Sequence, residues 1–305
     1  MLREFEFSEP HEECPACAHL SLRSSASFSP SFDCCNSCST RFMNPPLTPQ
    51  YFDDLYSGEY WNQRGRDLQT RVKKQLDRAS VISFFLAKWL RGDSSASSLE
   101  VGAGYGGVSL GLKKLHNLRA TVFDPDLEAM NHAKTAGLEI FNEDGARSQQ
   151  NRRHFNLLMF VHVLEHQTHP REFLNRWLQY LDIGGLVVVE VPNGQVINHF
   201  SLVHPMIFTA SGLTRLLRSV GITGKIYRHS GSQNSALPKK YLLFIGKRHE
   251  VGSLLFRRLP VPLLSRFLST LLSNRYARAI DRRILGRVKP AISANRDSLR
   301  RTVEM

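Results

Sequence analysis

The period of the apolar positions changes several times along this chain. Between residues 66 and 91, apolar side chains recur every three or four positions, which predicts one long amphipathic helix. After this helix, short apolar runs alternate with segments of helical period. The runs predict strands at residues 98–101, 119–123, 138–141, 156–161 and 186–191. Helices are expected between them, near residues 107–116, 126–136 and 170–181.

This alternation of strands and helices is typical of a doubly wound α/β fold with a mostly parallel sheet. A helix near residues 209–220 follows, and two later runs predict strands at residues 224–228 and 240–246. The loop GSQNSALP (231–238) lies between these strands and suits an antiparallel hairpin. The sheet is therefore expected to have seven strands and to end in an antiparallel pair.

The glycine-rich segment LEVGAGYGG (99–107) joins the first of these strands to the next helix. Glycines let a ligand approach the backbone closely, and a helix N-terminus offers unpaired N–H groups. Glu100 stands two positions before the first glycine, where a carboxylate could bind the loop or the ligand. That position favours a zwitterionic, cationic cofactor over a pyrophosphate.

A dinucleotide-binding interpretation also fits these residues. Gly102, Gly104 and Gly107 satisfy the pattern G-x-G-x-x-G, and Asp124 lies 20 residues beyond Gly104. Asp124 ends the second predicted strand within FDPD (123–126), where its carboxylate could accept both hydroxyls of a ribose. Asp126 suits the N-cap of the helix that follows. Both cofactor types use such an acidic residue, so the glycine loop and Asp124 leave both open.

The segment HVLEH (162–166) comes directly after the apolar run LLMFV. It matches the zinc-peptidase pattern H-x-x-E-H, which needs His162 and His166 on one helical face with Glu165 as the base. Pro170 suits the start of a helix, so residues 162–169 are expected to form a short loop instead. Because ligands of open α/β sheets bind at the carboxyl ends of strands, this loop should line a ligand pocket.

Two of these segments carry a family resemblance. Glu-x-Gly-x-Gly-x-Gly, at residues 100–106, resembles motif I of class I S-adenosylmethionine (SAM) methyltransferases, whose fold is a Rossmann-like, seven-stranded α/β sheet. HVLEH resembles the stretch after the fourth strand in many small-molecule methyltransferases. Together they favour SAM over NAD. The resemblance implies a cofactor site formed by Glu100, Gly102, Ala103, Gly104, Gly106, Asp124, Pro125, Asp144, His162 and Tyr60.

For Asp144 and Tyr60, the resemblance implies a specific role, and each residue also has an alternative interpretation. The resemblance implies that Asp144, or else Glu143, binds the adenine amino group, although a solvated loop carboxylate is the alternative. It also implies that Tyr60 closes over SAM. The aromatic segment that contains Tyr51, Tyr56 and Tyr60 could instead be a hydrophobic strap between the N-terminal region and the α/β body.

Methyl transfer from SAM is an in-line displacement at carbon, so the protein mainly aligns donor and acceptor. A general base helps when the acceptor is a hydroxyl or an activated carbon. The candidates are His166, Glu165 and His204, and a pKa near neutrality favours the histidines. His204 opens HPMIFTASGL, which resembles a family segment that faces the acceptor; a solvated loop histidine is the alternative.

All five cysteines lie between residues 14 and 38. Cys14-x2-Cys17 and Cys35-x2-Cys38, separated by 17 residues, fit the spacing of a four-thiolate zinc site. Cys34 could replace Cys35 as a ligand. Four protein thiolates would close the coordination shell, which predicts a structural Zn²⁺ rather than a catalytic one. Their position also leaves the α/β body without a cysteine for a thiolate-adduct mechanism.

The positive charge is concentrated at the C-terminal end. Residues 247–305 contain 14 Lys or Arg and four Asp or Glu, a net charge of +10 out of +13. The apolar and basic positions there predict an amphipathic helix, which could lie on an anionic membrane surface, dock on the body or a second subunit, or bind nucleic acid. No secretory signal is evident, so a cytoplasmic protein is expected, peripheral at the inner membrane face if the helix binds lipid.

Four regions are therefore predicted: a zinc module (1–45), an aromatic strap and helix (46–91), a methyltransferase domain (92–248) and a basic helical tail (249–305). Residues from Cys14 to about Lys247 resemble bacterial methyltransferases with an N-terminal zinc module, often acting on sugars, glycans or secondary-metabolite intermediates. We expect O- or C-methylation of such a small molecule or glycan. An RNA methyltransferase, whose module and tail would bind RNA, and a non-catalytic SAM-binding protein are the alternatives. The oligomeric state stays open.

Overall fold

The computed structural model describes residues 6–20, 22–24, 31–56, 67–90, 96–143, 154–196, 202–231 and 238–249. All of them belong to one compact unit, Met1–Val251. Tyr60, Asp144 and the predicted C-terminal amphipathic helix lie outside the described residues. No helix in the described part of the chain combines the length and the hydropathy that a membrane-spanning segment needs.

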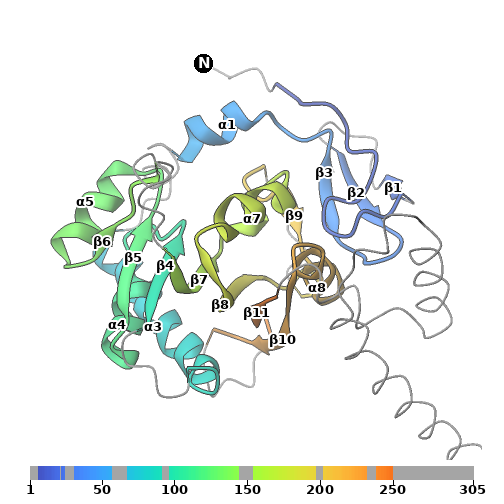
Figure 1. The fold of residues 1–305 in the computed structure, drawn as a ribbon. Coiled ribbons are helices and arrows are strands. Elements are labelled where there is room, and N and C mark those ends of the chain that lie inside the picture. The colour runs from blue at the N-terminus through green and yellow to red at the C-terminus, as the bar shows by residue number, and fades with distance from the viewer. Residues whose placement is uncertain are drawn as a thin grey trace, which may run out of the picture. The chain divides into compact units, whose positions relative to one another are not determined.

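A seven-stranded sheet with the order β10-β11-β8-β7-β4-β5-β6 forms the centre of the fold (Figure 1). Its parallel part consists of β4 (Ser97–Val101), β5 (Arg119–Phe123), β6 (Glu139–Ile140), β7 (Phe155–Val161) and β8 (Leu181–Pro192). An antiparallel hairpin, β10 (Ile222–His229) and β11 (Tyr241–Arg248), adds to β8. The structure thus confirms the predicted doubly wound α/β sheet and its antiparallel end.

Helices cover both faces of this sheet, because successive side chains of a strand point to opposite sides. On β7, Leu157 and Met159 pack against α3 (Leu68–Leu86) and α4 (Gly107–His116). Leu158 and Phe160 belong to the core under α7 (Pro170–Leu178) and α8 (Ala210–Ser219). The short helix α5 (Leu127–Thr135) packs on β5 through Met130 and Ala133. Because both faces of the sheet are covered, the sequences of the buried strands are almost continuous apolar runs.

The boundaries differ from the predicted ones where the local pattern is ambiguous. Strand β8 begins at Leu181, five residues before the predicted start, because Phe155 pairs with Leu181 ahead of an irregularity in the register. Gly184, with φ at 83°, lies inside this strand rather than in a turn before it. Residues 49–54, which belong to the predicted aromatic strap, form the short helix α1 (Pro49–Asp54).

A second, antiparallel sheet links the N-terminal region to the body. Its order is β1-β2-β3-β9. The first three strands, β1 (Leu22–Ser24), β2 (Ser31–Cys35) and β3 (Arg41–Asn44), come from the cysteine-containing region. The fourth, β9 (Met206–Ile207), comes from the segment between β8 and α8. These strands of two to five residues carry too little periodicity for a prediction from sequence.

Candidate functional site

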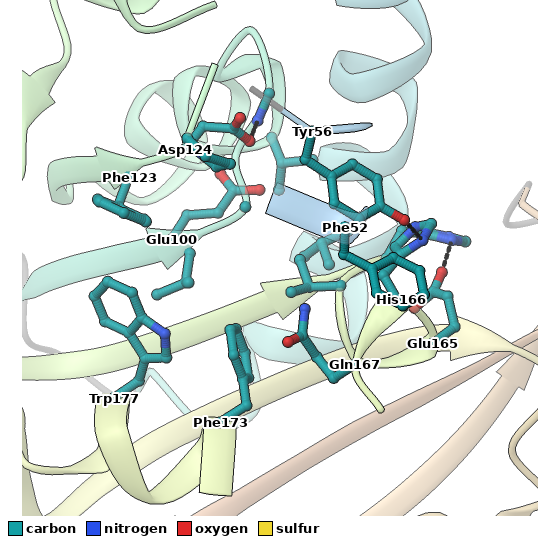
Figure 2. Close-up of a pocket in the computed structure, with 18 of the residues that line it drawn as sticks. Phe52, Tyr56, Glu100, Phe123, Asp124, Glu165, His166, Gln167, Phe173 and Trp177 are labelled. Atoms are coloured by element: carbon teal, nitrogen blue, oxygen red, sulfur yellow. Dashed lines mark hydrogen bonds and ion pairs between the residues drawn. The ribbon is translucent and has the colours of Figure 1, made fainter. Parts of the chain in front are cut away.

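A cavity of about 770 Å³ lies at the carboxyl ends of the parallel strands (Figure 2). Its wall combines the glycine loop, the ends of β5 and β7, the 3₁₀ turn η3 (Leu164–His166), and residues of α1, α3 and α7. The volume is in the range of small-molecule sites. We call the part formed by residues 100–126 the cofactor half, and the part around His166 and His204 the acceptor half.

The backbone of the glycine loop requires glycine at several positions. Gly102, Gly104 and Gly106 have φ values of 72°, 53° and 77°, which L-residues with a side chain rarely adopt. These are the glycines of the pattern E-x-G-x-G-x-G. Gly107 has no such angle, and it is needed for close packing, since a Cβ there would lie 2.6 Å from Cβ of Gln75 on α3.

Asp124 ties the glycine loop to the end of β5. Its Oδ2 accepts a hydrogen bond from the Gly104 amide at 2.7 Å, and its Oδ1 accepts one from the Asp126 amide at 3.0 Å. A carboxylate can accept about four hydrogen bonds, so capacity for two more remains. Burial raises the pKa of Asp124 to about 6. Asp126 accepts from the Glu128 and Ala129 amides, which confirms it as the N-cap of α5.

Glu100 is buried beside Asp124, with 1% of its surface exposed (Figure 2). Its Oε2 accepts hydrogen bonds from the Ser109 amide at 3.0 Å and the Ser109 hydroxyl at 2.5 Å. Burial raises its pKa to about 7 against the effect of these bonds. These bonds join Glu100 to α4, directly after the glycine loop.

Aromatic side chains form one wall of the cofactor half. The ring centroids of Phe123 and Trp177 lie 4.8 Å apart, and Phe173 also lines the cavity. Next to them, Glu143 accepts from Arg176 Nε at 2.7 Å and from Arg176 Nη2, a bidentate ion pair. Glu143 is thereby engaged within the protein. Phe173 and Trp177 lie on α7, and no sequence motif pointed to them.

His162 is held between two carboxylates at the end of β7. Its Nδ1 lies 2.9 Å from Glu165 Oε1 and its Nε2 lies 3.0 Å from Glu190 Oε1. Burial and Arg78 lower the pKa of His162, but the two carboxylates outweigh them and the pKa is raised. A ring protonated at both nitrogens can donate to both carboxylates. His162 also has a left-handed φ of 56°.

Glu190 and Arg78 complete this buried charge network. Arg78 Nε lies 2.8 Å from Glu190 Oε1, so the pair connects α3 to β8 beside the cavity. Burial alone would raise the pKa of Glu190, yet Arg78 and the histidines His162 and His229 hold it well below its usual range. Glu190 is therefore ionised, and the Arg78 guanidinium balances its charge.

His166 has a defined tautomer. Its Nδ1 lies 2.5 Å from the Val203 carbonyl and 2.6 Å from Tyr56 Oη. A carbonyl oxygen only accepts, so Nδ1 carries the hydrogen and the lone pair of the neutral ring is on Nε2. Burial lowers the pKa of His166 to about 4, although Glu165 raises it. The ring is neutral at pH 7 and lines the cavity.

The predicted base candidates come together in space. The rings of His166 and His204 meet edge to face with centroids 4.7 Å apart, and Glu165 precedes His166 in η3. One ligand atom from each of Glu165, His166 and His204 lies within 4.8 Å of the others, so the group could also hold a cation. The loop predicted for residues 162–169 exists, and no peptidase-type helix forms there.

The four predicted zinc ligands also form a cluster. The sulfur atoms of Cys14 and Cys38 lie 3.8 Å apart, and those of Cys17 and Cys35 lie 3.5 Å apart. A tetrahedral zinc with Zn–S bonds of about 2.3 Å places its sulfurs about 3.8 Å from one another. None of the cysteines is in a disulfide, and Cys35 rather than Cys34 joins the cluster. The donor set therefore fits Zn²⁺.

Comparison with known proteins identifies a family. The family model described as Methyltransferase domain matches residues 60–229, more than half of the 305-residue chain. A search of curated protein sequences found no match.

Solved structures with some likeness include a SAM-dependent methyltransferase from Thermotoga maritima, at 15% identity and TM-score 0.42, covering 57% of this chain and 91% of that chain. The plantazolicin methyltransferase BpumL, in complex with a desmethyl-plantazolicin analogue and SAH, has 16% identity and TM-score 0.46, covering 63% and 88%. The glycopeptide N-methyltransferase MtfA, complexed with SAM, has 11% identity and TM-score 0.44, covering 56% and 93%. Values this low carry no argument about the acceptor.

Proposed function

The chain belongs to the methyltransferase domain family, and we propose that it uses SAM to methylate a hydroxyl group of a small molecule such as a sugar, glycan or secondary-metabolite intermediate. The observation that carries the proposal is His166, a neutral imidazole whose lone pair is fixed on Nε2 at the cavity wall. An activated carbon acid would use the same base.

The cofactor half supports SAM as the methyl donor. SAM supplies an electrophilic methyl group on a sulfonium. The two remaining acceptor positions of the Asp124 carboxylate suit the hydroxyls of a ribose, and Pro125 lies beside it in the cavity wall. Gly102, Ala103, Gly104 and Gly106 allow the backbone to approach the bound molecule closely, and Glu100 holds the helix behind them.

The acceptor half supports general-base catalysis. As the acceptor oxygen attacks the methyl carbon in line with the breaking C–S bond, whose electron pair stays on sulfur, Nε2 of His166 accepts the hydroxyl proton. Nδ1 stays bonded to the Val203 carbonyl, so the ring keeps its orientation. The carboxylate of Glu165 stabilises the imidazolium that results, as its effect on the pKa of His166 indicates. His204 lies against the same ring.

The lining of the acceptor half supports a small, partly apolar acceptor. Phe52 and Tyr56 of α1 and its C-terminal extension have nearly parallel rings, with an interplanar angle of 14°. Gln167 and Thr168 add hydrogen-bonding groups to the same wall. Flat aromatic faces beside donors and acceptors suit a sugar-like molecule, which has both apolar and hydroxyl-rich faces.

The cysteine cluster supports a structural role for Zn²⁺. Cys14, Cys17, Cys35 and Cys38 would supply all four ligands and leave no coordination position for a substrate. The metal would therefore stabilise the N-terminal module without entering the reaction.

Transfer of a labelled methyl group from SAM tests the proposed function. Purified protein is incubated with labelled SAM and an extract of the source cells, which is then separated into nucleic acid, lipid-linked and small-molecule fractions. We expect label in the small-molecule or lipid-linked fraction, and none with Asp124→Ala. Label in RNA would overturn the small-molecule acceptor in favour of an RNA methyltransferase. SAM binding without label in any fraction would indicate a non-catalytic SAM-binding protein.

A further inference from the structure

The cysteine module is joined by hydrogen bonds to the segment that contains Val203 and His204. Strand β3 pairs with β9 through Arg41 with Ile207 and Phe42 with Met206. One residue further along β3, the Met43 amide donates to the Pro205 carbonyl at 2.8 Å. The backbone directly after His204 is therefore fixed by the module.

A second set of contacts holds the other end of this segment. The Thr209 hydroxyl donates to the Cys38 carbonyl at 2.6 Å and accepts from the Gly212 amide at 3.0 Å, so it joins the module to the N-terminus of α8. The two surfaces are very close here, since a Cβ on Gly212 would lie 3.4 Å from the Cys38 sulfur and closer still to Thr40. The module and α8 are therefore in direct contact at this point.

From these contacts we infer that the cysteine module is a positioning element of the acceptor half. With its metal bound, it fixes residues 202–209, and through the Val203 carbonyl it fixes the tautomer and orientation of His166. The inference rests on the proposed function for the role of His166. Cys38 and Thr209 are positioning residues in this sense, because neither of them lines the cavity.

The cofactor half does not depend on these contacts. Its hydrogen bonds join Gly104 to Asp124, Glu100 to Ser109, and the amides of Gly102 and Ala103 to Phe123. Gln75 of α3 also bonds to the Ala103 carbonyl and the Gly107 amide, and none of these partners belongs to the module or to residues 202–209. Small zinc modules unfold when their metal is removed, because metal binding supplies their folding free energy. Loss of the metal should therefore loosen residues 202–209 and leave SAM binding in place.

Metal removal from the full chain is the first test. Zinc content, the Kd for SAM, the acceptor KM and kcat, and amide hydrogen exchange are measured before and after treatment with a chelator. We expect faster exchange in residues 202–209, a fall in kcat of about tenfold to 100-fold, and a Kd for SAM that changes by less than about twofold. Unchanged exchange in residues 202–209 after complete metal loss would overturn the inference, and so would an equal loss of SAM binding.

The variant Thr209→Val, with Thr209→Ser as its partner, separates positioning from stability. The valine has the shape of threonine but neither bonds to the Cys38 carbonyl nor caps α8, whereas serine does both. Thr214→Val is the matched control, since the Thr214 hydroxyl bonds to the Ala210 carbonyl within α8 rather than to the module. We expect a lower kcat with Thr209→Val, rescue by Thr209→Ser, and an unchanged kcat with Thr214→Val.

The pH dependence of kcat distinguishes positioning of His166 from a purely structural role of the module, which would leave that dependence unchanged. Glu165, His162 and His204 are the titratable groups whose charges act on His166, and Tyr56 and the Val203 carbonyl bond to it. When residues 202–209 loosen, the ring becomes more hydrated, so the acid limb of kcat should move up towards the ordinary histidine value. An acid limb that stays in place in Thr209→Val would contradict the inference. If the zinc-loaded protein methylates nothing, the proposed function fails, and hydrogen exchange still decides the inference.

Discussion

The two halves of the cavity are built in different ways. In the cofactor half, the linked residues are close in sequence: Glu100 and Ser109 are nine positions apart, and Gly104 and Asp124 are 20 apart. In the acceptor half, 110 positions separate Tyr56 from His166, and 147 separate Tyr56 from Val203. One strand–turn–helix–strand unit therefore supplies the glycine loop and its carboxylates, to which α3 and α7 add Gln75 and an aromatic wall. Packing of distant segments forms the acceptor site. Changes in one half should leave the other half intact.

Replacing the base should have the largest effect. His166→Ala removes the group that accepts the hydroxyl proton, which should lower kcat by about 100-fold to 10,000-fold. Because the hydrogen bonds of His166 to the Val203 carbonyl and to Tyr56 lie outside the cofactor half, the Kd for SAM should change by less than about twofold. Steady-state kinetics and calorimetry measure the two quantities. Tyr56→Phe, which keeps the ring and removes only the hydroxyl, should lower kcat less. A weakened SAM affinity in His166→Ala would show that the halves are coupled.

Asp124→Ala should weaken SAM binding strongly and lower kcat only a little, the opposite of His166→Ala. On the proposed function, it removes two charge-assisted hydrogen bonds to a ribose, each worth about 1.5–3 kcal/mol, so the Kd for SAM should rise about 100-fold or more. It also removes the bond to the Gly104 amide, which loosens the loop. The kcat at saturating SAM should fall much less than in His166→Ala. Calorimetry measures the Kd, and an affinity close to that of the unmodified chain would rule out ribose binding by Asp124.

The two halves should also respond to different pH ranges. Burial raises the pKa of Asp124 to about 6, so the carboxylate protonates as the pH falls below that value, and SAM affinity should fall about tenfold per pH unit there. Above about pH 7 the Asp124 carboxylate is almost fully ionised, so its contribution to the affinity should be constant. Burial lowers the pKa of His166 to about 4, so the base stays neutral, and kcat at saturating SAM should hold until the pH approaches 4. Measuring the Kd for SAM and kcat over the same pH range compares the two dependences.

The difference between the halves also explains what the sequence could predict. The parallel sheet follows from apolar runs whose period is local, and the glycine loop and Asp124 belong to one short motif with a local geometry. His166, His204 and Glu165 were candidates because their residue types suit a base. Their arrangement depends on β3 pairing with β9 and on Tyr56 reaching His166, contacts between distant segments that no local pattern encodes. The aromatic wall of Phe173 and Trp177 escaped prediction because on α7 it resembles an ordinary core face.

The smallest expected effect is that of a substitution at Asp126, which tests whether Asp126 and Asp124 have different roles. Asp126 caps α5, whereas Asp124 faces the cavity, although both follow β5. Asp126→Ala should lower the free energy of unfolding by about 1 kcal/mol, while Asp126→Asn, which keeps an acceptor oxygen at the cap, should lower it less. Denaturant titration measures this. The Kd for SAM should stay within about twofold of that of the unmodified chain, because the bond to Asp124 Oδ1 comes from the Asp126 backbone amide. A loss of SAM affinity in Asp126→Ala as large as in Asp124→Ala would mean that the order of the whole turn, rather than the Asp124 carboxylate, determines binding in the cofactor half.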